Sequence, residues 1–71
     1  MKRHFEFIAD SSAKFWEIAV NGNEVTVRFG RIGTEGQTQV KTLADVGAAT
    51  KHAEKLIRSK TAKGYCETVA C

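Results

Sequence analysis

Two runs of alternating apolar residues flank an Asn-Gly-Asn triplet, and this feature constrains the fold more than any other. The runs are KFWEIAV at 14–20 and EVTVRF at 24–29. An Asn-Gly step between such runs is a strong signal for a β-hairpin, whose turn needs positive φ at its two central residues. The turn falls either on Asn21 and Gly22 or on Gly22 and Asn23. Both registers place the same side chains on one face, which we predict to be the core face: Trp16, Ile18, Val20, Val25, Val27 and Phe29.

The opposite face of the hairpin carries Phe15, Glu17, Ala19, Thr26 and Arg28. Because Glu17 and Arg28 are diagonal neighbours in one register and direct neighbours in the other, we expect them to interact. Unbroken alternation past the glycine would bring Arg31 into the core after Phe29, where an unpaired guanidinium is costly. We therefore predict that the strand bulges or ends at Gly30, with Phe29 at the rim of the core and Arg31 turned outward.

Further strands are predicted at 4–9 and 37–44, with a short one at 65–70. After Asp45 the apolar residues take a helical period: Val46, Ala49, Ala53, Leu56 and Ile57. Asp45 is a suitable N-cap, and Gly64 followed by Tyr65 suits a Schellman ending, so a helix is predicted from about 46 to 63.

The predicted fold class is α+β. We expect one domain over 1–71, built from a small antiparallel sheet of about four strands with one long C-terminal helix packed on its apolar face. Hydrophobic residues make up 42% of the chain and charged residues 27%, and proline is absent, which is typical of an ordinary globular protein.

The N-terminal sequence MKRHFEFIAD lacks the apolar run of a signal peptide, and no run is long enough to span a membrane. We therefore expect a cytoplasmic protein without a membrane partner. Cys66 and Cys71 have no zinc-site spacing, so we expect free thiols in a reducing compartment. The alternative is a terminal thiol that oxidises or links two chains.

Arrangements of residues that are typical of catalysis are missing from the sequence. It contains no Ser/His/Asp spacing, no H-E-x-x-H and no phosphate-binding loop motif. His4 and His52 are expected to be structural. We predict that the chain is not an enzyme and needs neither a cofactor nor a metal.

The stretch RFGRIGTEGQ at 28–37 is the first candidate for a binding surface. Its three glycines, Gly30, Gly33 and Gly36, indicate a tight turn with a bulge, or alternatively a backbone nest for an anion. Phe29 beside Arg31 suits stacking and phosphate contact, although core packing also explains the phenylalanine.

Basic residues gather in the second half of the chain, where residues 41–71 carry the whole net charge of +3. On the predicted helix, Lys51, Lys55 and Arg58 share one face. That face is either solvated and favoured by the helix dipole, or a patch that contacts phosphates. The charge asymmetry favours a polyanionic partner.

The order of these features resembles the WGR domain over nearly the whole chain. A hairpin is followed by Phe-Gly-Arg-Ile-Gly-Thr, a Gly-Gln step, a strand, a lysine-rich helix and Lys-Gly-Tyr. WGR modules are found in poly(ADP-ribose) polymerases, where they help to recognise DNA breaks and pass the signal to a catalytic domain, and in small bacterial proteins. The resemblance implies an antiparallel sheet with one helix, no catalytic activity and nucleic-acid binding.

The signature of this family falls on Phe29, Gly30 and Arg31. The resemblance implies that the aromatic ring stacks on a terminal sugar or base, that the glycine permits close approach, and that the arginine contacts the backbone. Phenylalanine stands here in place of tryptophan, so the stacking face is kept and the indole N–H is lost.

Two functions are therefore expected as alternatives. The first is a freestanding module that binds nucleic acid, DNA ahead of RNA and including ends or breaks, through phosphate contacts. Its predicted site is Phe29, Gly30, Arg31, Gly33, Lys41, Lys51, Lys55 and Arg58. The second is a protein interaction or regulatory adaptor module that uses the same loop. Nucleic-acid binding weakens with salt and with each basic residue lost, whereas a protein interface depends on one aromatic or arginine anchor.

Overall fold

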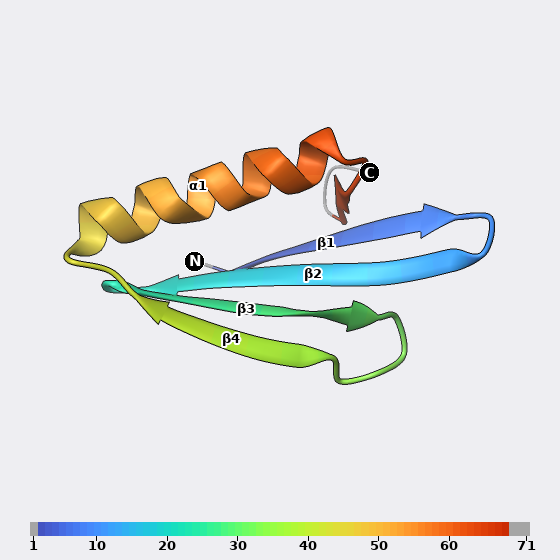
Figure 1. Ribbon diagram of the computed structural model, residues 1–71, viewed down its shortest axis with the longest axis horizontal. Coiled ribbons are helices and arrows are strands. Elements are labelled where there is room, and N and C mark those ends of the chain that lie inside the picture. The colour runs from blue at the N-terminus through green and yellow to red at the C-terminus, as the bar shows by residue number, and fades with distance from the viewer. Residues whose placement is uncertain (1, 69–71) are drawn as a thin grey trace.

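The computed structural model describes residues 2–68, which form a five-stranded antiparallel sheet with one helix across one face (Figure 1). The strands are β1 (Lys2–Ala9), β2 (Ser12–Asn21), β3 (Glu24–Arg31), β4 (Gln37–Thr42) and β5 (Cys66–Glu67), and the helix is α1 (Val46–Ala62). Across the sheet the strand order is β4-β3-β2-β1-β5. The predicted α+β class is confirmed.

The central hairpin adopts the second of the two predicted registers. Val20 pairs with Val25 and Ile18 with Val27, so the turn residues are Gly22 and Asn23. Gly22 has φ +63°, and no non-glycine residue in the described chain has positive φ. The turn therefore has the glycine-first character of type II′, and the prediction of positive φ at both central residues is wrong.

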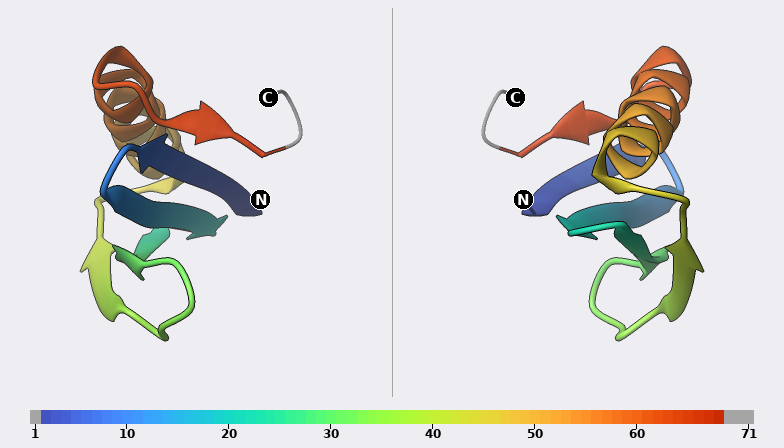
Figure 2. Two further views of the ribbon diagram at one scale, coloured as in Figure 1. Left: turned by 90° about the vertical axis from the view of Figure 1, so that its right-hand side faces the viewer. Right: turned by 90° about the vertical axis from the view of Figure 1, so that its left-hand side faces the viewer.

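The core lies between α1 and the first three strands. Its buried residues are Phe5, Trp16, Ile18, Val25, Ala49, Ala53 and Ile57. Figure 2 shows α1 along one side of the sheet and β4 at the outer edge. Every residue of β4 is exposed, so the covered part of the apolar face ends at β3.

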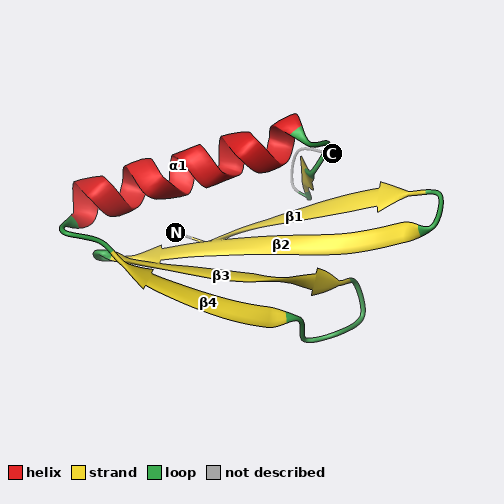
Figure 3. Cartoon of the chain, viewed as in Figure 1, coloured by secondary structure: helices red, strands yellow, loops and turns green. Residues whose placement is uncertain are grey.

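Both ends of α1 have the predicted caps. Oδ1 of Asp45 accepts a hydrogen bond of 2.8 Å from the Ala48 N–H. At the other end Gly64 has φ +107° and donates to the Thr61 carbonyl, while Tyr65 donates to the Lys60 carbonyl, each at 3.1 Å. These two bonds are those of a Schellman motif. Figure 3 shows in green the loops and turns that connect the strands and the helix.

Strand β3 neither bulges nor ends at Gly30, so that prediction is wrong. Gly30 pairs with Phe15 and Arg31 pairs with Lys14, in regular continuation of the hairpin. Alternation therefore puts Arg31 on the face of Phe29, but the side chain is exposed. The guanidinium avoids burial because the strand runs past the end of the packed core.

A second buried site lies on the face of the sheet away from the helix, around Phe15. This ring is only 4% exposed, because the loop between β3 and β4 folds back over it. A Cβ added to Gly36 would lie 2.8 Å from Cζ of Phe15, and one added to Gly30 would lie 2.8 Å from Cα of Gly36. The guanidinium of Arg28 lies 4.9 Å from the centre of the same ring. Of the three glycines in this loop region, Gly30 and Gly36 are therefore needed for the close packing of the loop on the strand and on the Phe15 ring.

The edge formed by β1 and β5 is fastened by an ion pair between Arg3 and Glu67. Nε and Nη2 of Arg3 donate to the Glu67 carboxylate at 2.7 and 2.6 Å. Cys66 is disulfide-bonded, so the free-thiol prediction is wrong for this residue, and Cys71 lies outside the described residues. The strand predicted at 65–70 is confirmed only for Cys66–Glu67, and its last two positions also lie outside the described part.

Over residues 2–68 the helix is neither long nor apolar enough to cross a membrane.

Candidate functional site

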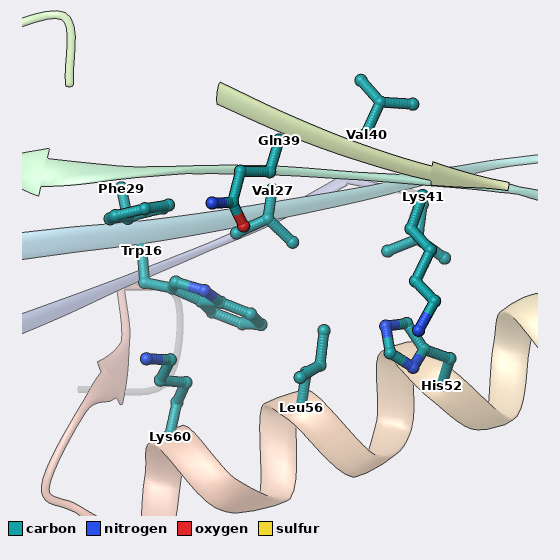
Figure 4. Close-up of a pocket in the computed structure, with 10 residues that line it drawn as sticks. Trp16, Val27, Phe29, Gln39, Val40, Lys41, His52, Leu56 and Lys60 are labelled. Carbon is teal, nitrogen blue, oxygen red and sulfur yellow. The ribbon is translucent and has the colours of Figure 1, made fainter. Parts of the chain in front are cut away.

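A groove of about 750 Å³ runs between α1 and the strands β3 and β4, and we call it the helix groove (Figure 4). Its floor includes Val25, Val27, Phe29 and Leu56, and its rim carries Gln39, Lys41, His52 and Lys60. In Figure 4 Lys41 reaches from β4 toward His52 on the helix, whereas Val40 points away. The groove exists because β4 extends the sheet beyond the area that α1 covers.

A second hollow, of about 370 Å³, lies at the end of β3 that carries Arg31, and we call it the signature pocket. Lys14, Arg31 and Lys60 line it together with the hydroxyl-bearing Ser11 and Ser12 and the rings of Trp16, Phe29 and Tyr65. Trp16, Phe29 and Lys60 line both the pocket and the helix groove. The two hollows are therefore neighbours that share one aromatic wall.

The charged side chains that line the two hollows are all basic. Within residues 2–68, no carboxylate lines the helix groove or the signature pocket. Two carboxylates of the described chain pair with cations elsewhere: Glu17 with Arg28 and Lys2, and Glu67 with Arg3. The electrostatic field over the two hollows is consequently attractive to anions.

Lys60 is the most unusual of these basic residues. Its Nζ lies 5.8 Å from the ring centre of Trp16 and 5.5 Å from that of Tyr65, within cation–π range. It forms no ion pair with a carboxylate in residues 2–68. Burial, with the positive charge of Lys63 in addition, lowers the pKa of Lys60 below its ordinary value. An anion bound beside this ammonium group would offset the loss of hydration.

The structure brings only part of the predicted site together. Phe29, Gly30 and Arg31 line the signature pocket, and Lys41 lies on the rim of the helix groove. Gly33 is exposed in the loop, where φ is +98° and no atom would contact an added Cβ. Its conformation explains the glycine without a ligand.

The basic helix residues lie on a different surface. Lys51, Lys55 and Arg58 are exposed. At the angular spacing of an α-helix they lie roughly 140–160° around the axis from the side that buries Ala53. They therefore face away from the sheet and are not brought to Arg31. Their part in binding stays a prediction for a separate surface.

Sequence patterns did not single out Lys14, Gln39 and Lys60. Lys60 follows His52 and Leu56 at steps of four residues, which is the spacing of one helix flank. Lys14 lies opposite Arg31 in the register that the hairpin adopts. Both signals can be read from the sequence, but only once the register and the position of the helix are known.

His4 is structural, as predicted. Its ring nitrogens lie 3.2 Å from carboxylate oxygens of Glu6 and Glu17, and the ring stacks on Phe15 with 5.9 Å between centres. Within the described residues no three His, Cys, Asp or Glu side chains are grouped as a metal site would require. His52 instead lines the helix groove.

A small antiparallel sheet crossed by one helix, with a basic hollow at a Phe-Gly-Arg strand end, defines a class of small binding modules. The chain belongs to the WGR family, whose domain matches residues 1–70, so the predicted resemblance is confirmed. It is similar to two proteins of Escherichia coli strain K12. Protein YehF is 43% identical over 65 residues, which cover 92% of this chain and 24% of YehF. YfeS is 37% identical over 67 residues, which cover 94% of this chain and 28% of YfeS.

A solved structure has the same fold. The crystal structure of a Bacteroides fragilis protein matches with a TM-score of 0.93 and 54% sequence identity, over 96% of this chain and 19% of that one. The chain thus spans about a quarter of the length of the E. coli relatives and less of the solved one.

Proposed function

We propose that this WGR module binds nucleic acid, with DNA as the first candidate, through phosphate contacts at the signature pocket. The WGR domain is a module associated with nucleic-acid binding. The observation that carries the proposal is the convergence of Lys14, Arg31 and Lys60 on a pocket that no carboxylate of the described residues lines. Phosphate contacts of this kind position a nucleic acid without reading its sequence.

Three residues of the pocket have distinct parts in the proposed binding. The exposed Arg31 offers a planar guanidinium that can hold a phosphate through two hydrogen bonds. Lys60 supplies a charge that its aromatic neighbours orient but do not neutralise. The half-buried ring of Phe29 forms part of the wall and presents an apolar surface to a terminal sugar or base.

A protein interaction through the same loop is the second candidate. Ile32 is an exposed apolar side chain directly after Arg31, and together they resemble the anchor of a protein interface. Binding through such an anchor tolerates salt, whereas phosphate binding does not.

The test is the fluorescence anisotropy of labelled blunt duplex, nicked duplex and single-stranded oligonucleotides at about 50 and 200 mM salt, the range over which phosphate contacts lose most affinity. We expect Arg31→Ala to weaken duplex binding about tenfold and to reduce the salt slope by about one, because one charged contact is lost. Arg58→Ala, the same substitution on the outer face of the helix, should weaken binding less than about threefold. Absence of binding at low salt, or equal losses in the two variants, would contradict the proposal.

A further inference from the structure

We propose that the helix groove receives an unpaired nucleotide that extends from a nucleic acid bound at the signature pocket. This inference rests on the proposed function and names its target more closely: a duplex with a single-stranded extension. Three features of the groove support it, namely its apolar floor, a side-chain amide on its rim and its charge.

The floor of the helix groove matches the faces of a nucleobase. Val27 and Phe29 from β3 and Leu56 from α1 form an apolar surface between two secondary-structure elements. The volume of about 750 Å³ lies within the roughly 300–1,000 Å³ that is usual for small-ligand sites. A base removed from its stack has two apolar faces to bury, and the groove offers apolar walls from both the sheet and the helix.

Gln39 supplies a group that can contact the edge of such a base. In Figure 4 its side-chain amide points into the groove from β4. The amide makes no side-chain hydrogen bond within residues 2–68. Because it carries both a donor and an acceptor, it can pair with the mixed donors and acceptors of a base edge.

The charges around the groove favour a polyanion as the occupant. Lys41 and His52 stand at one end of the rim and Lys60 at the other, and none of the carboxylates in residues 2–68 lines the walls. Trp16, Phe29 and Lys60 belong to both hollows, so a strand held by Arg31 can continue into the groove past basic and aromatic side chains alone. This continuity favours a nucleic-acid strand over an unrelated acidic peptide.

The experiment compares a labelled blunt duplex with the same duplex carrying a three-nucleotide single-stranded extension, on the full chain at about 50 mM salt, where phosphate contacts are strong. We expect the extension to tighten binding about fivefold in the wild type, and Gln39→Ala to remove most of that gain while blunt-duplex affinity stays the same. The matched control is Gln37→Ala, the same change on the same strand at a residue that does not line the groove. It should keep the full gain.

Leu56→Trp gives a second, independent variant, because the larger ring fills the groove from the helix side. It should also remove the gain, provided that circular dichroism shows a folded protein. If the blunt duplex binds with salt dependence but the extension adds nothing, this inference fails and the proposed function stands. If no oligonucleotide binds, both fail. Displacement of the extended duplex by a glutamate peptide of equal charge, to the same degree in wild type and Gln39→Ala, would overturn the inference in favour of an acidic peptide.

Discussion

Gly36 is the residue whose identity the fold restricts most tightly. Its φ is +71°, and an added Cβ would meet the carbonyl oxygen of Phe29 and the ring of Phe15. Gly33 in the same loop also has positive φ, but open space surrounds it. We expect Gly33→Ala to lower the free energy of unfolding by about 1–2 kcal/mol, which is the cost of left-handed backbone alone. Gly36→Ala should cost about 1–3 kcal/mol more, because it adds overpacking.

Urea unfolding followed by circular dichroism measures both variants. The difference between them is the informative quantity, since the backbone penalty is common to both. Equal losses would mean that the loop moves away from Phe15 without cost, and that the second buried site contributes little to stability.

The side chains that share each face of the central hairpin could be predicted from the sequence, because both possible registers place the same residues on the same face. The burial of Phe15 could not. Its ring is on the face away from the helix, and the residue that covers it, Gly36, comes from a loop whose path no local pattern determines. The bulge at Gly30 was predicted wrongly for a related reason, although Arg31 is exposed as expected. Alternation predicts a face, but the end of the core depends on where the helix stops covering the sheet.

Among the elements, three strands are joined by one carboxylate on the far face of the sheet. Glu17 of β2 accepts a 3.2 Å hydrogen bond from Nε of Arg28 on β3, and it lies 3.2 Å from Nδ1 of His4 and 3.7 Å from Nζ of Lys2, both on β1. Burial alone would raise the pKa of Glu17. The hydrogen bonds from Arg28 and His4 and the charges of Arg28 and Lys2 together outweigh it, so the pKa is lowered from the ordinary 4.5.

A lowered pKa in the folded state links stability to pH. The contribution of Glu17 is complete above its ordinary pKa of 4.5 and is lost as the pH falls through the lowered folded value. We expect the melting temperature of the wild type to fall steeply below about pH 4.5, and Glu17→Gln to melt lower at pH 7 but to lose less on acidification. Thermal melts from pH 7 to pH 3 test this. Glu24→Gln, at the exposed end of β3, should keep the wild-type profile, and a Glu17→Gln profile parallel to the wild type would contradict the prediction.

The elements themselves were accessible from local signals, since Asp45, Gly22 and Gly64 each have a direct backbone cause. The two hollows were not accessible in the same way. A stripe of apolar residues shows which side of a helix is buried, but not how far the helix lies toward β4. That distance decides whether Lys41 and Lys60 line one groove, and it results from packing among residues far apart in the sequence.

For the whole molecule, the small core makes each buried side chain important. A domain of this size has a total stability of roughly 5–10 kcal/mol at most. We expect Ile18→Ala, at a fully buried position, to cost about 2–5 kcal/mol. Ile8→Ala removes the same atoms from a side chain that is 73% exposed, and should change stability by less than about 0.5 kcal/mol. Thermal melts by circular dichroism distinguish the two, and an Ile18→Ala protein that melts with the wild type would contradict this description of the core.

The molecule also separates its charges by face. Glu17 is neutralised by neighbouring cations on the far side of the sheet, while Arg31, Lys41 and Lys60 line hollows into which the described part of the chain places no carboxylate. A modest net charge is thereby concentrated beside the helix, where both the proposed function and the further inference require it.

Trp16 is the single tryptophan of the chain, and it lies where the core, the helix groove and the signature pocket meet. Its indole emission therefore originates from one known position. Unfolding would expose that ring to water, and a ligand in either hollow would change its surroundings without unfolding the protein. The fold thus contains its own optical reporter, which allows stability and occupancy to be followed on unlabelled, unmodified protein.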